Sequence, residues 1–491
     1  MKKYILELTN FLAGALGMII ELVAARILSP YLGNSQLIWT CIIGMMLAFM
    51  SVGYYIGGKI ADKKPSKSIM SLFLLNAALF TSLIPLIEVE IIKPLSGLTT
   101  KINPSIIAII CSSITFGPTS LFLATISPFA VKLKEIEYEK ENNIGKISGK
   151  MSALSTIGSI VGTFTAGFIL IPNIGVKNII LISTIIIFIL SFILYEEKTI
   201  PYIIKSILTI TILMGIIIHG KTLFHKSNPD IILDTDSEYS RIWIRKINKS
   251  SKQIYTLEAD KGYESISTNN GTLYSDYMKY YDLFDYYNSN TQNVLMIGGA
   301  AYVYPTYFLN TFKNKNIDVI EIDPKMTRLA EEYFNLDTKN KRLSIHHQDG
   351  RAYLNNTSKK YDCILIDAFK GINAPFHLAT YEAVLNSKKA LNENGILIAN
   401  IASSLEGEES DFIKHEYSTY KAVFDEVKLF KVQGNIFQEN ELQNLILIGF
   451  KNAPQADTEK KEIYESLLKN ELIEFKSNKP IVTDDFCPIG V

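Results

Sequence analysis

The stretch NVLMIGGA at residues 293–300 decides the fold of the C-terminal half of the chain. Four apolar residues follow Asn293 without a break and glycines then end the run, which is typical of a strand buried on both faces of a parallel sheet. Further strands are predicted at 317–323, 343–347, 361–367 and 394–401, with helices at 305–313 and 324–335. Strands that alternate with helices predict a doubly wound α/β domain.

The first two strand ends carry candidate binding residues. Gly298 and Gly299 end the first strand and let the backbone come close to a bound nucleoside. Glu321 ends the second strand, where its carboxylate is placed to accept hydrogen bonds from a ribose diol. Because ligands bind at the carboxyl ends of the strands in such sheets, we expect these residues to line one site.

The next two strands also end in acids. Asp349, with Gly350 beside it, is placed to accept a hydrogen bond from an exocyclic amine, and Asp367 faces the reacting centre. The glycine run is GGAAYV and lacks the GxGxxG spacing, which favours a nucleoside without a pyrophosphate, such as S-adenosylmethionine or its relatives. A tight turn would explain the glycines equally well, so the prediction depends on the whole series of strand ends.

The N-terminal half is predicted to be an α-helical transmembrane bundle. The chain has 49 Lys and Arg against 49 Asp and Glu, but residues 1–220 carry a net charge of +6 and the remainder −6. This acidic remainder argues against nucleic-acid binding, and the apolar content excludes a disordered chain. A helix needs about 20 apolar residues to cross a bilayer. About seven segments meet this length: 4–28, 38–58, 69–87, 102–131, 151–176, 178–195 and 199–219.

Some charged and small residues inside these spans indicate how the helices of the bundle pack. Glu21 and Arg26 form a polar site or a structural ion pair, or Arg26 reaches the membrane interface. Gly158 and Gly162 match the GxxxG spacing, which favours close packing of two helices.

Lysines in the short loops predict the orientation of the bundle. The N-terminus and the loops at 59–67 and 132–146 are rich in lysine, so the positive-inside rule places all three in the cytoplasm. With seven spans the C-terminal half would then lie outside the cell. Its nucleoside ligand is cytosolic, however, and on this ground we expect an integral plasma membrane protein with a cytosolic catalytic domain.

Three parts are therefore predicted along the chain. Residues 1–220 form the transmembrane domain, residues 230–290 a small β subdomain, and residues 291–491 the Rossmann-like domain. The four cysteines show no metal-ligand spacing, so we expect no metal.

Motifs in the C-terminal half carry a family resemblance. They are SEYSRIWI (237–244), VLMIGGA (294–300), VIEIDPKM (319–326), HHQDGRAYL (346–354), YDCILIDAF (361–369) and IVTDDFCP (481–488). Residues 230–491 resemble the spermidine synthase family of aminopropyltransferases, which implies an α/β Rossmann-like, methyltransferase-type domain with a small β subdomain. DAFKGINAPFHLATYE (367–382) and GGKIAD (57–62) are similar to its membrane-fused subfamily.

The resemblance implies a reaction and roles for several residues. A nucleophile attacks the carbon next to the sulfonium of S-adenosylmethionine, or of its decarboxylated form, and methylthioadenosine leaves. Glu321 would hold the ribose, Asp349 the adenine and Asp367 the reacting region. Tyr274 matches the tyrosine of a family motif and is expected to be catalytic.

Two departures from the family pattern concern the substrates. Ala301 stands where the family usually has an Asp that helps to hold the aminopropyl end, and Lys370 stands where it has the acid that activates the amine acceptor. Lys370 either pairs with a substrate carboxylate, which favours intact S-adenosylmethionine, or is a solvated loop lysine. We expect Glu264 and His377 to contact the substrate, unless His377 only caps its loop.

Three functions stay open at this point. The first is a transferase that moves an aminopropyl-type group to an amine. The second is a lyase or cyclase in which the substrate's own carboxylate or amine displaces methylthioadenosine. The third is a nucleoside-sensing or transport protein with a non-catalytic domain. The expected partners are a small-molecule substrate and the lipid bilayer, and a homo-oligomer is allowed.

Overall fold

A computed structural model divides the chain into two compact units. The first consists of Met1–Pro229 and Asp234–Arg241, and the second of Asp230–Leu233 and Ile242–Val491. The residues that the structure describes are 4–32, 36–98, 102–137, 144–195, 209, 212, 215, 230–249, 252–259, 262–268, 273, 275–368, 375–434, 436–454 and 456–486.

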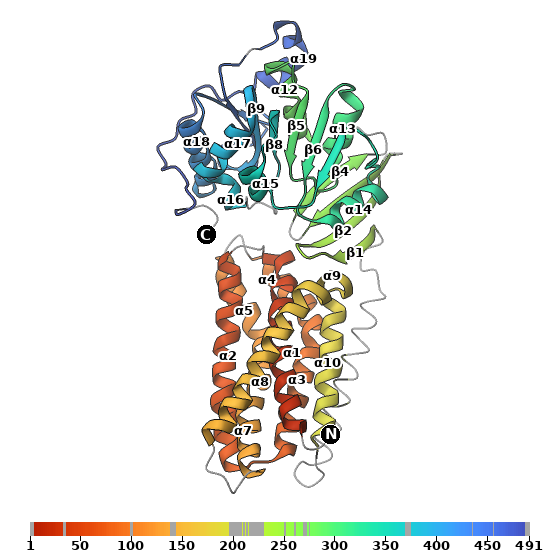
Figure 1. The fold of residues 1–491 in the computed structure, drawn as a ribbon, viewed down its shortest axis with the longest axis vertical. Helices are drawn as coiled ribbons and strands as arrows, with labels where there is room; N and C mark the ends of the chain where they lie inside the picture. The colour runs from red at the N-terminus through yellow and green to blue at the C-terminus, as the bar shows by residue number, and fades with distance from the viewer. Residues whose placement is uncertain are drawn as a thin grey trace. The chain divides into compact units, whose positions relative to one another are not determined.

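The first unit is a bundle of helices (Figure 1). Its helices are α1 (Ile5–Leu32), α2 (Gln36–Lys63), α3 (Lys67–Ile87), α4 (Lys93–Ser96), α5 (Pro104–Thr115), α6 (Gly117–Ala124), α7 (Ile126–Glu137), α8 (Ile144–Thr165), α9 (Ile171–Ile174) and α10 (Val176–Ile193). Short π-helical stretches continue α3 and α8, at Glu88–Ile92 and Ala166–Leu170.

Five helices of the described residues are long and apolar enough to cross a membrane, and a bent pair makes a sixth if it counts as one span. In this pair, Pro104–Thr115 and Gly117–Glu137 meet at 50°. Pro118 begins the second helix and has no N–H to continue the hydrogen-bond ladder, which explains the break. The seventh predicted span, 199–219, lies outside the described residues except at three positions. The structure therefore supports five or six of the seven predicted spans.

Ion pairs gather the lysine-rich segments at one end of the bundle. Lys134 in α7 lies 3.1 Å from Glu7 at the start of α1. Lys132 in α7 lies 3.7 Å from Asp62 at the end of α2. The start of α1, the end of α2 and the end of α7 are thus at the same end, which is the grouping that the loop lysines predict.

The segment Asp234–Arg241 is bound to the opposite end of this unit. The hydroxyl of Tyr31, near the end of α1, donates to Glu88 at 3.1 Å. Arg241 lies 3.7 Å from Glu88 and donates twice to Asp234, each time at 3.1 Å. A helix as long as α1 separates the two ends by about 40 Å.

Arg26 belongs to this second end as well. It donates a hydrogen bond to the backbone carbonyl of Glu238, whereas Glu21 is buried within the bundle. This agrees with the interpretation that Arg26 reaches the end of the bundle.

The glycines of α8 bring its backbone into contact with α1. A Cβ atom on Gly158 would overlap the carbonyl oxygen of Phe11, and one on Gly162 would overlap that of Ala15. Apolar side chains gain little by leaving lipid for another helix, so such close backbone packing is an important source of stability in a membrane bundle.

A pair of substitutions in α8 tests this contact. Gly158→Ala should destabilise the protein by about 1–3 kcal/mol, because the added methyl group has no room. Gly149→Ala is the matched control, since nothing lies within 4 Å of its added Cβ, and alanine should be neutral or stabilise the helix by up to about 1 kcal/mol. The measurement is the thermal midpoint of the detergent-solubilised chain. Equal midpoints for the two variants would contradict the packing role of Gly158.

The second unit contains two sheets. The small one has the order β1-β2-β3-β4 and the large one the order β10-β11-β9-β8-β5-β6-β7. The strands are β1 (Ile231–Asp236), β2 (Arg241–Lys249), β3 (Lys252–Ala259), β4 (Gly262–Thr268), β5 (Asn293–Ile297), β6 (Asn316–Ile320), β7 (Leu343–His346), β8 (Tyr361–Ile366), β9 (Leu391–Ser403), β10 (Glu426–Lys431) and β11 (Gln443–Phe450).

The large sheet is parallel from β9 to β7, as the alternating pattern predicts, and ends in an antiparallel pair. β11 pairs with both β9 and β10 in antiparallel register, an edge that the sequence analysis did not predict. The physical reason is that a short connection can join antiparallel strands without a crossover helix.

Helices cover both faces of the large sheet (Figure 1). Val294 and Met296 of β5 face one core, while Leu295 and Ile297 face the other. This explains why β5 is apolar throughout. The helical segments of this unit are Asp276–Asp282, α12 (Leu283–Tyr287), α13 (Val303–Thr311), α14 (Pro324–Tyr333), α15 (Gly350–Asn356), α16 (Phe376–Ala379), α17 (Tyr381–Ala390), Glu408–Ser410, α18 (Asp411–Val423), Thr458–Lys460 and α19 (Lys461–Leu468).

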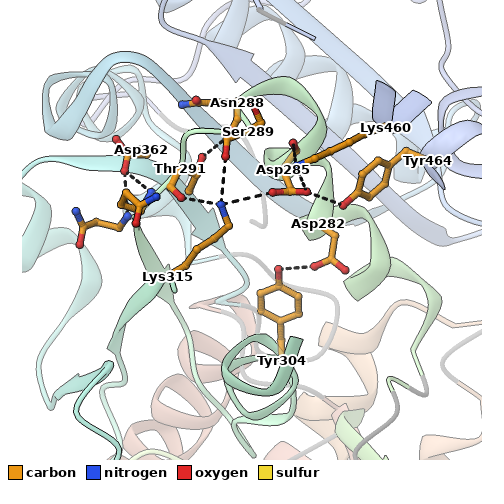
Figure 2. A network of polar contacts seen from close by, with 12 residues as sticks. Asp282, Asp285, Asn288, Ser289, Thr291, Tyr304, Lys315, Asp362, Lys460 and Tyr464 are labelled. Carbon is orange, nitrogen blue, oxygen red and sulfur yellow. Dashed lines mark hydrogen bonds and ion pairs between the residues drawn. The ribbon is translucent and has the colours of Figure 1, made fainter. Parts of the chain in front are cut away.

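A polar network fastens the amino ends of the central strands (Figure 2). Asp285 lies 2.7 Å from Lys460 and 3.5 Å from Lys315, and Lys315 also donates to the carbonyl of Thr291 at 2.7 Å. Asp362 accepts hydrogen bonds from the backbone N–H groups of residues 292 and 293. These contacts fix the sheet at the edge away from the strand ends that carry the candidate site.

Candidate active site

The carboxyl ends of four adjacent strands form the candidate site. In the order β8-β5-β6-β7 these strands end next to Asp367, Gly298, Glu321 and Asp349. Sequence positions almost 70 residues apart therefore meet along one edge of the sheet. This is the edge at which ligands bind in open α/β sheets.

Gly298 allows the loop after β5 to touch the end of β8. Its φ is +93°, and a Cβ at this position would overlap the carbonyl oxygen of Asp367. The contact is reinforced because the N–H of Asp367 donates to the carbonyl of Ile297 at 2.9 Å. Two non-glycine residues of the same loop, Ala300 and Tyr302, also have a positive φ, of 44° and 55°. Such conformations persist where the surroundings enforce them and often mark functional loops.

Glu321 holds this loop with both of its carboxylate oxygens. One oxygen accepts hydrogen bonds from the N–H groups of Gly299 at 2.8 Å and Ala300 at 2.9 Å. The other accepts from the N–H of Asp323 at 2.9 Å. Glu321 is 7% exposed. Burial raises the pKa of its carboxyl, although the three N–H groups favour the charged form. Three of the four lone-pair sites of the carboxylate are thus used, and one, on the oxygen bound by Asp323, is left for a ligand hydroxyl.

Asp349 begins α15 and faces His377. One of its oxygens accepts from the N–H of Ala352 at 2.8 Å as the helix N-cap, and the other lies 3.2 Å from Nε2 of His377. The two predicted site residues are therefore brought together and both are partly exposed. Gly350 packs against β5, since its added Cβ would lie 2.5 Å from the side chain of Ile297.

Asp367 is held by two neutral donors. The side-chain amide of Asn400 in β9 donates to one oxygen at 3.2 Å, and the hydroxyl of Tyr277 donates to the other at 3.3 Å. The residue keeps part of its surface accessible, but desolvation of the carboxyl raises its pKa, and the neighbouring amide and hydroxyl groups oppose this rise. A carboxylate with a raised pKa accepts a proton more readily than an exposed one.

Three predicted site residues cannot be placed at the site. Tyr274 and Lys370 lie outside the described residues, and of Glu264 only the backbone, in β4, is described. Ala301, where the family usually has an acid, is fully buried, and its N–H donates to Ser265 at 3.3 Å.

Sequence reasoning missed the two residues that hold Asp367. Asn400 is a polar residue inside the apolar run ILIANI, and this is a signal that could have identified it. Tyr277 stands in a segment with many tyrosines, where the sequence alone does not show which ring faces the site. The structure divides this segment: Tyr280, Tyr286 and Tyr287 are core residues, whereas Tyr277 donates to Asp367 and the buried Tyr281 also interacts with it.

A second buried acid lies behind these tyrosines. Asp282 accepts hydrogen bonds from the hydroxyls of Tyr304 and Tyr307, both at 2.8 Å. Burial raises the pKa of Asp282 to about 6, against the two hydrogen bonds. Ionising Asp282 therefore costs more free energy in the folded protein than in the unfolded chain.

Asp282→Asn should reveal this cost through its pH dependence. The folded-state pKa of Asp282 lies above its unfolded value, so the protein loses stability as the pH rises from about 4 to 7, by up to about 3 kcal/mol. The variant lacks this loss and should gain stability relative to the unsubstituted chain over the same range. Thermal midpoints at several pH values test this, and parallel curves would contradict it.

The arrangement defines an α/β domain of the Rossmann-like, methyltransferase type, with acids at the ends of its second to fourth parallel strands. Residues 273–443 match the spermine/spermidine synthase domain family. Over this segment the chain is similar to members of the spermine/spermidine synthase family.

Individual proteins of this family are similar to parts of the chain. A polyamine aminopropyltransferase of Vibrio vulnificus is 33% identical over 149 residues, which cover 30% of this chain and 48% of the relative. Polyamine aminopropyltransferase 2 of Aquifex aeolicus is 23% identical over 410 residues, 80% of this chain and 78% of the relative. The chain spans about half the length of the first curated relatives that it matches. A probable spermidine synthase from Corynebacterium glutamicum superposes with a TM-score of 0.46 at 19% identity, covering 53% of this chain and 98% of that structure.

Proposed function

We propose that this protein is a membrane-bound, aminopropyltransferase-like enzyme that cleaves S-adenosylmethionine or its decarboxylated form to methylthioadenosine. The observation that carries the proposal is the setting of Asp367, which combines a raised pKa with two neutral hydrogen-bond donors at the carboxyl end of β8. The family assignment and the names of the relatives support the same reaction.

The neighbouring strand ends suit the nucleoside part of such a donor. Glu321 has one lone-pair site left to accept from a ribose hydroxyl, and Asp349 has a partly exposed carboxylate for an exocyclic amine. These acids make contact with N–H groups and a histidine rather than with lysine or arginine, so their negative charge is kept for a cationic sulfonium. No group of three or more His, Cys, Asp or Glu that suits a metal ion occurs within the described part of the chain.

In the proposed reaction the amine nitrogen of the acceptor attacks the carbon next to the sulfonium. A carbon–nitrogen bond forms, the carbon–sulfur bond breaks, and its electron pair leaves with methylthioadenosine. The proton that the amine loses passes to Asp367. The sulfonium is already a good leaving group, so the protein contributes chiefly by orienting the reactants and by its electrostatic field.

A lyase or cyclase is the second candidate, and one observation favours it. Ala301 is fully buried where the family usually has an acid, so the carboxylate expected to hold the aminopropyl end is absent at this position. If the substrate's own carboxylate or amine displaces methylthioadenosine, no acceptor is needed.

Asp367→Asn should lower the release of methylthioadenosine at least about a hundredfold, because the amide cannot take the proton. Binding of methylthioadenosine should change little, since Asn400 and Tyr277 remain. Asp425→Asn, an exposed site, is the matched control. Liquid chromatography of the products measures turnover with either donor, with and without 1,4-diaminobutane.

The same assay distinguishes the candidate functions. Release of methylthioadenosine that needs the amine supports the transferase, and release without the amine supports the lyase. Unchanged turnover in Asp367→Asn would contradict the role of Asp367, and a chain without turnover would favour a sensor or transporter.

The membrane-fused form of the family is part of this proposal. The match to the Aquifex aeolicus relative covers 80% of the chain and so extends into the N-terminal helices, several of which are long and apolar enough for a bilayer. Two arguments about the side of the membrane on which the C-terminal domain lies disagree. The lysine-rich end is opposite to the end that holds Asp234–Arg241, which under the positive-inside rule favours the outside, whereas a donor made in the cytosol requires the inside.

A reporter enzyme fused after Val491 tests on which side of the membrane the C-terminal domain lies. Because the proposed donor is cytosolic, we expect a reporter that works only in the cytosol to be active. A control fusion after Lys67 reports the lysine-rich end. Activity of an extracellular reporter at Val491 would contradict the cytosolic placement and would restrict the donor to one supplied outside the cell.

A further inference from the structure

A cavity opens into the helical bundle at its lysine-rich end, among α2, α7 and α8. Its volume is about 460 Å³, which is in the range of small-molecule sites. Each helix contributes one face to it, since the lining residues recur at helical spacing, as Ser148, Ser152 and Ser155 do in α8. All of the lining residues belong to the first unit, so this cavity is separate from the candidate active site.

Hydroxyl groups that are open to a ligand line this cavity. Elsewhere in the bundle, serine and threonine hydroxyls donate to the carbonyl four residues earlier, as those of Thr81, Ser112 and Thr184 do. Because a hydroxyl both donates and accepts, one without such a bond is available to a polar ligand. The hydroxyls that line the cavity and form no hydrogen bond with any described residue are those of Ser127, Ser148, Ser152, Ser155 and Thr156.

A second, smaller cavity continues the first toward the middle of the bundle. Its volume is about 30 Å³, and Tyr54, Ser127 and Ser155 line both cavities. Asn10 of α1 also lines the smaller one and is fully buried. Its amide nitrogen donates to the carbonyl of Met151 at 2.6 Å, whereas its Oδ1 has no partner among the described residues. A buried acceptor without a partner is costly, so this oxygen calls for a group that donates a hydrogen bond.

Three charged side chains line the larger cavity at its open end, where the side chain of Asp62 is 73% exposed. Lys132 lies 2.9 Å from Glu135 and 3.7 Å from Asp62, so two carboxylates share one lysine and the lining has a net charge of −1. The other described lysines of this end do not line the cavity, and two of them lie within 3.4 Å of Glu7 instead. A ligand that is a cation would compensate the excess carboxylate, whereas an anion would add to the negative charge.

An aliphatic amine meets these requirements. Its ammonium group donates hydrogen bonds to carboxylate, hydroxyl and amide oxygens. Its methylene groups can pack on Val131 and Pro128, which line the cavity between the levels of Glu135 and Ser127 along α7.

We propose that the bundle binds a small protonated aliphatic amine in this cavity, which the amine enters from the lysine-rich end. The inference does not depend on the proposed function, because it involves no residue of the second unit. It gives the bundle a binding role in addition to that of a membrane anchor.

A cysteine placed in the cavity tests this site in the detergent-solubilised full chain. Ser152→Cys should react with a small water-soluble methanethiosulfonate, and saturating 1,4-diaminobutane should slow the reaction at least about tenfold, because the bound amine covers the thiol. Mass spectrometry of the labelled peptide distinguishes this thiol from the four native cysteines. Ser113→Cys, on α5 and outside the cavity, is the matched control and should be unaffected by the diamine.

Butane-1,4-diol has the length of the diamine without its charge and should leave the reaction of Ser152→Cys unchanged. Protection by the diol equal to that by the diamine would overturn the assignment of a cation. No protection by the diamine, or no reaction of Ser152→Cys, would overturn the site itself.

A pair of substitutions in the Ser152→Cys chain tests the role of the charge. Glu135→Gln should raise the diamine concentration for half-maximal protection at least about fivefold, because the lining loses a negative charge. Glu137→Gln removes the same charge from the same helix outside the cavity, and it should change this concentration less than twofold. Equal effects of the two substitutions would overturn the proposal. Release of methylthioadenosine is measured alongside: protection without release would refute only the proposed function, and release without protection only this site.

Discussion

The contact between the backbones of Gly298 and Asp367 is the constraint on which the site depends. It brings the loop after β5 against the end of β8 so closely that no side chain fits between them. From this position the loop presents two N–H groups to Glu321, and Asp367 lies beside the same edge. The donors that hold these acids are neutral, so the edge keeps the negative charge that the proposed sulfonium ligand requires.

Much of the fold could be predicted, because strands buried on both faces leave a strong signal. The parallel strands from 293 to 401 follow from continuous apolar runs between helical patterns. The edge pair β10–β11 could not, since antiparallel pairing depends on partners far apart in the sequence and on no local period. The helical bundle could be predicted only in part. Length and hydropathy indicate the spans, but the break at Pro118 and the position of Asp234–Arg241 depend on packing.

At the candidate site, residues that directly follow the end of a parallel strand could be predicted from the sequence. Residues that contact the site from other positions could not. Glu321 and Asp367 follow directly from strand ends. Asn400 and Tyr277 contact Asp367 from β9 and from a helical turn, and their orientation depends on the twist of the sheet and on packing.

The hold of Glu321 on the glycine loop has a consequence for the thermodynamics of recognition. The loop is held in one shape without a ligand, because three backbone N–H groups donate to the carboxylate of Glu321. Binding of the proposed nucleoside then does not include the free-energy cost of ordering this loop, so more of the energy of its contacts becomes affinity. Such a rigid cradle would discriminate among related nucleosides by shape, and it would show little structural change and a modest heat of binding when the ribose arrives.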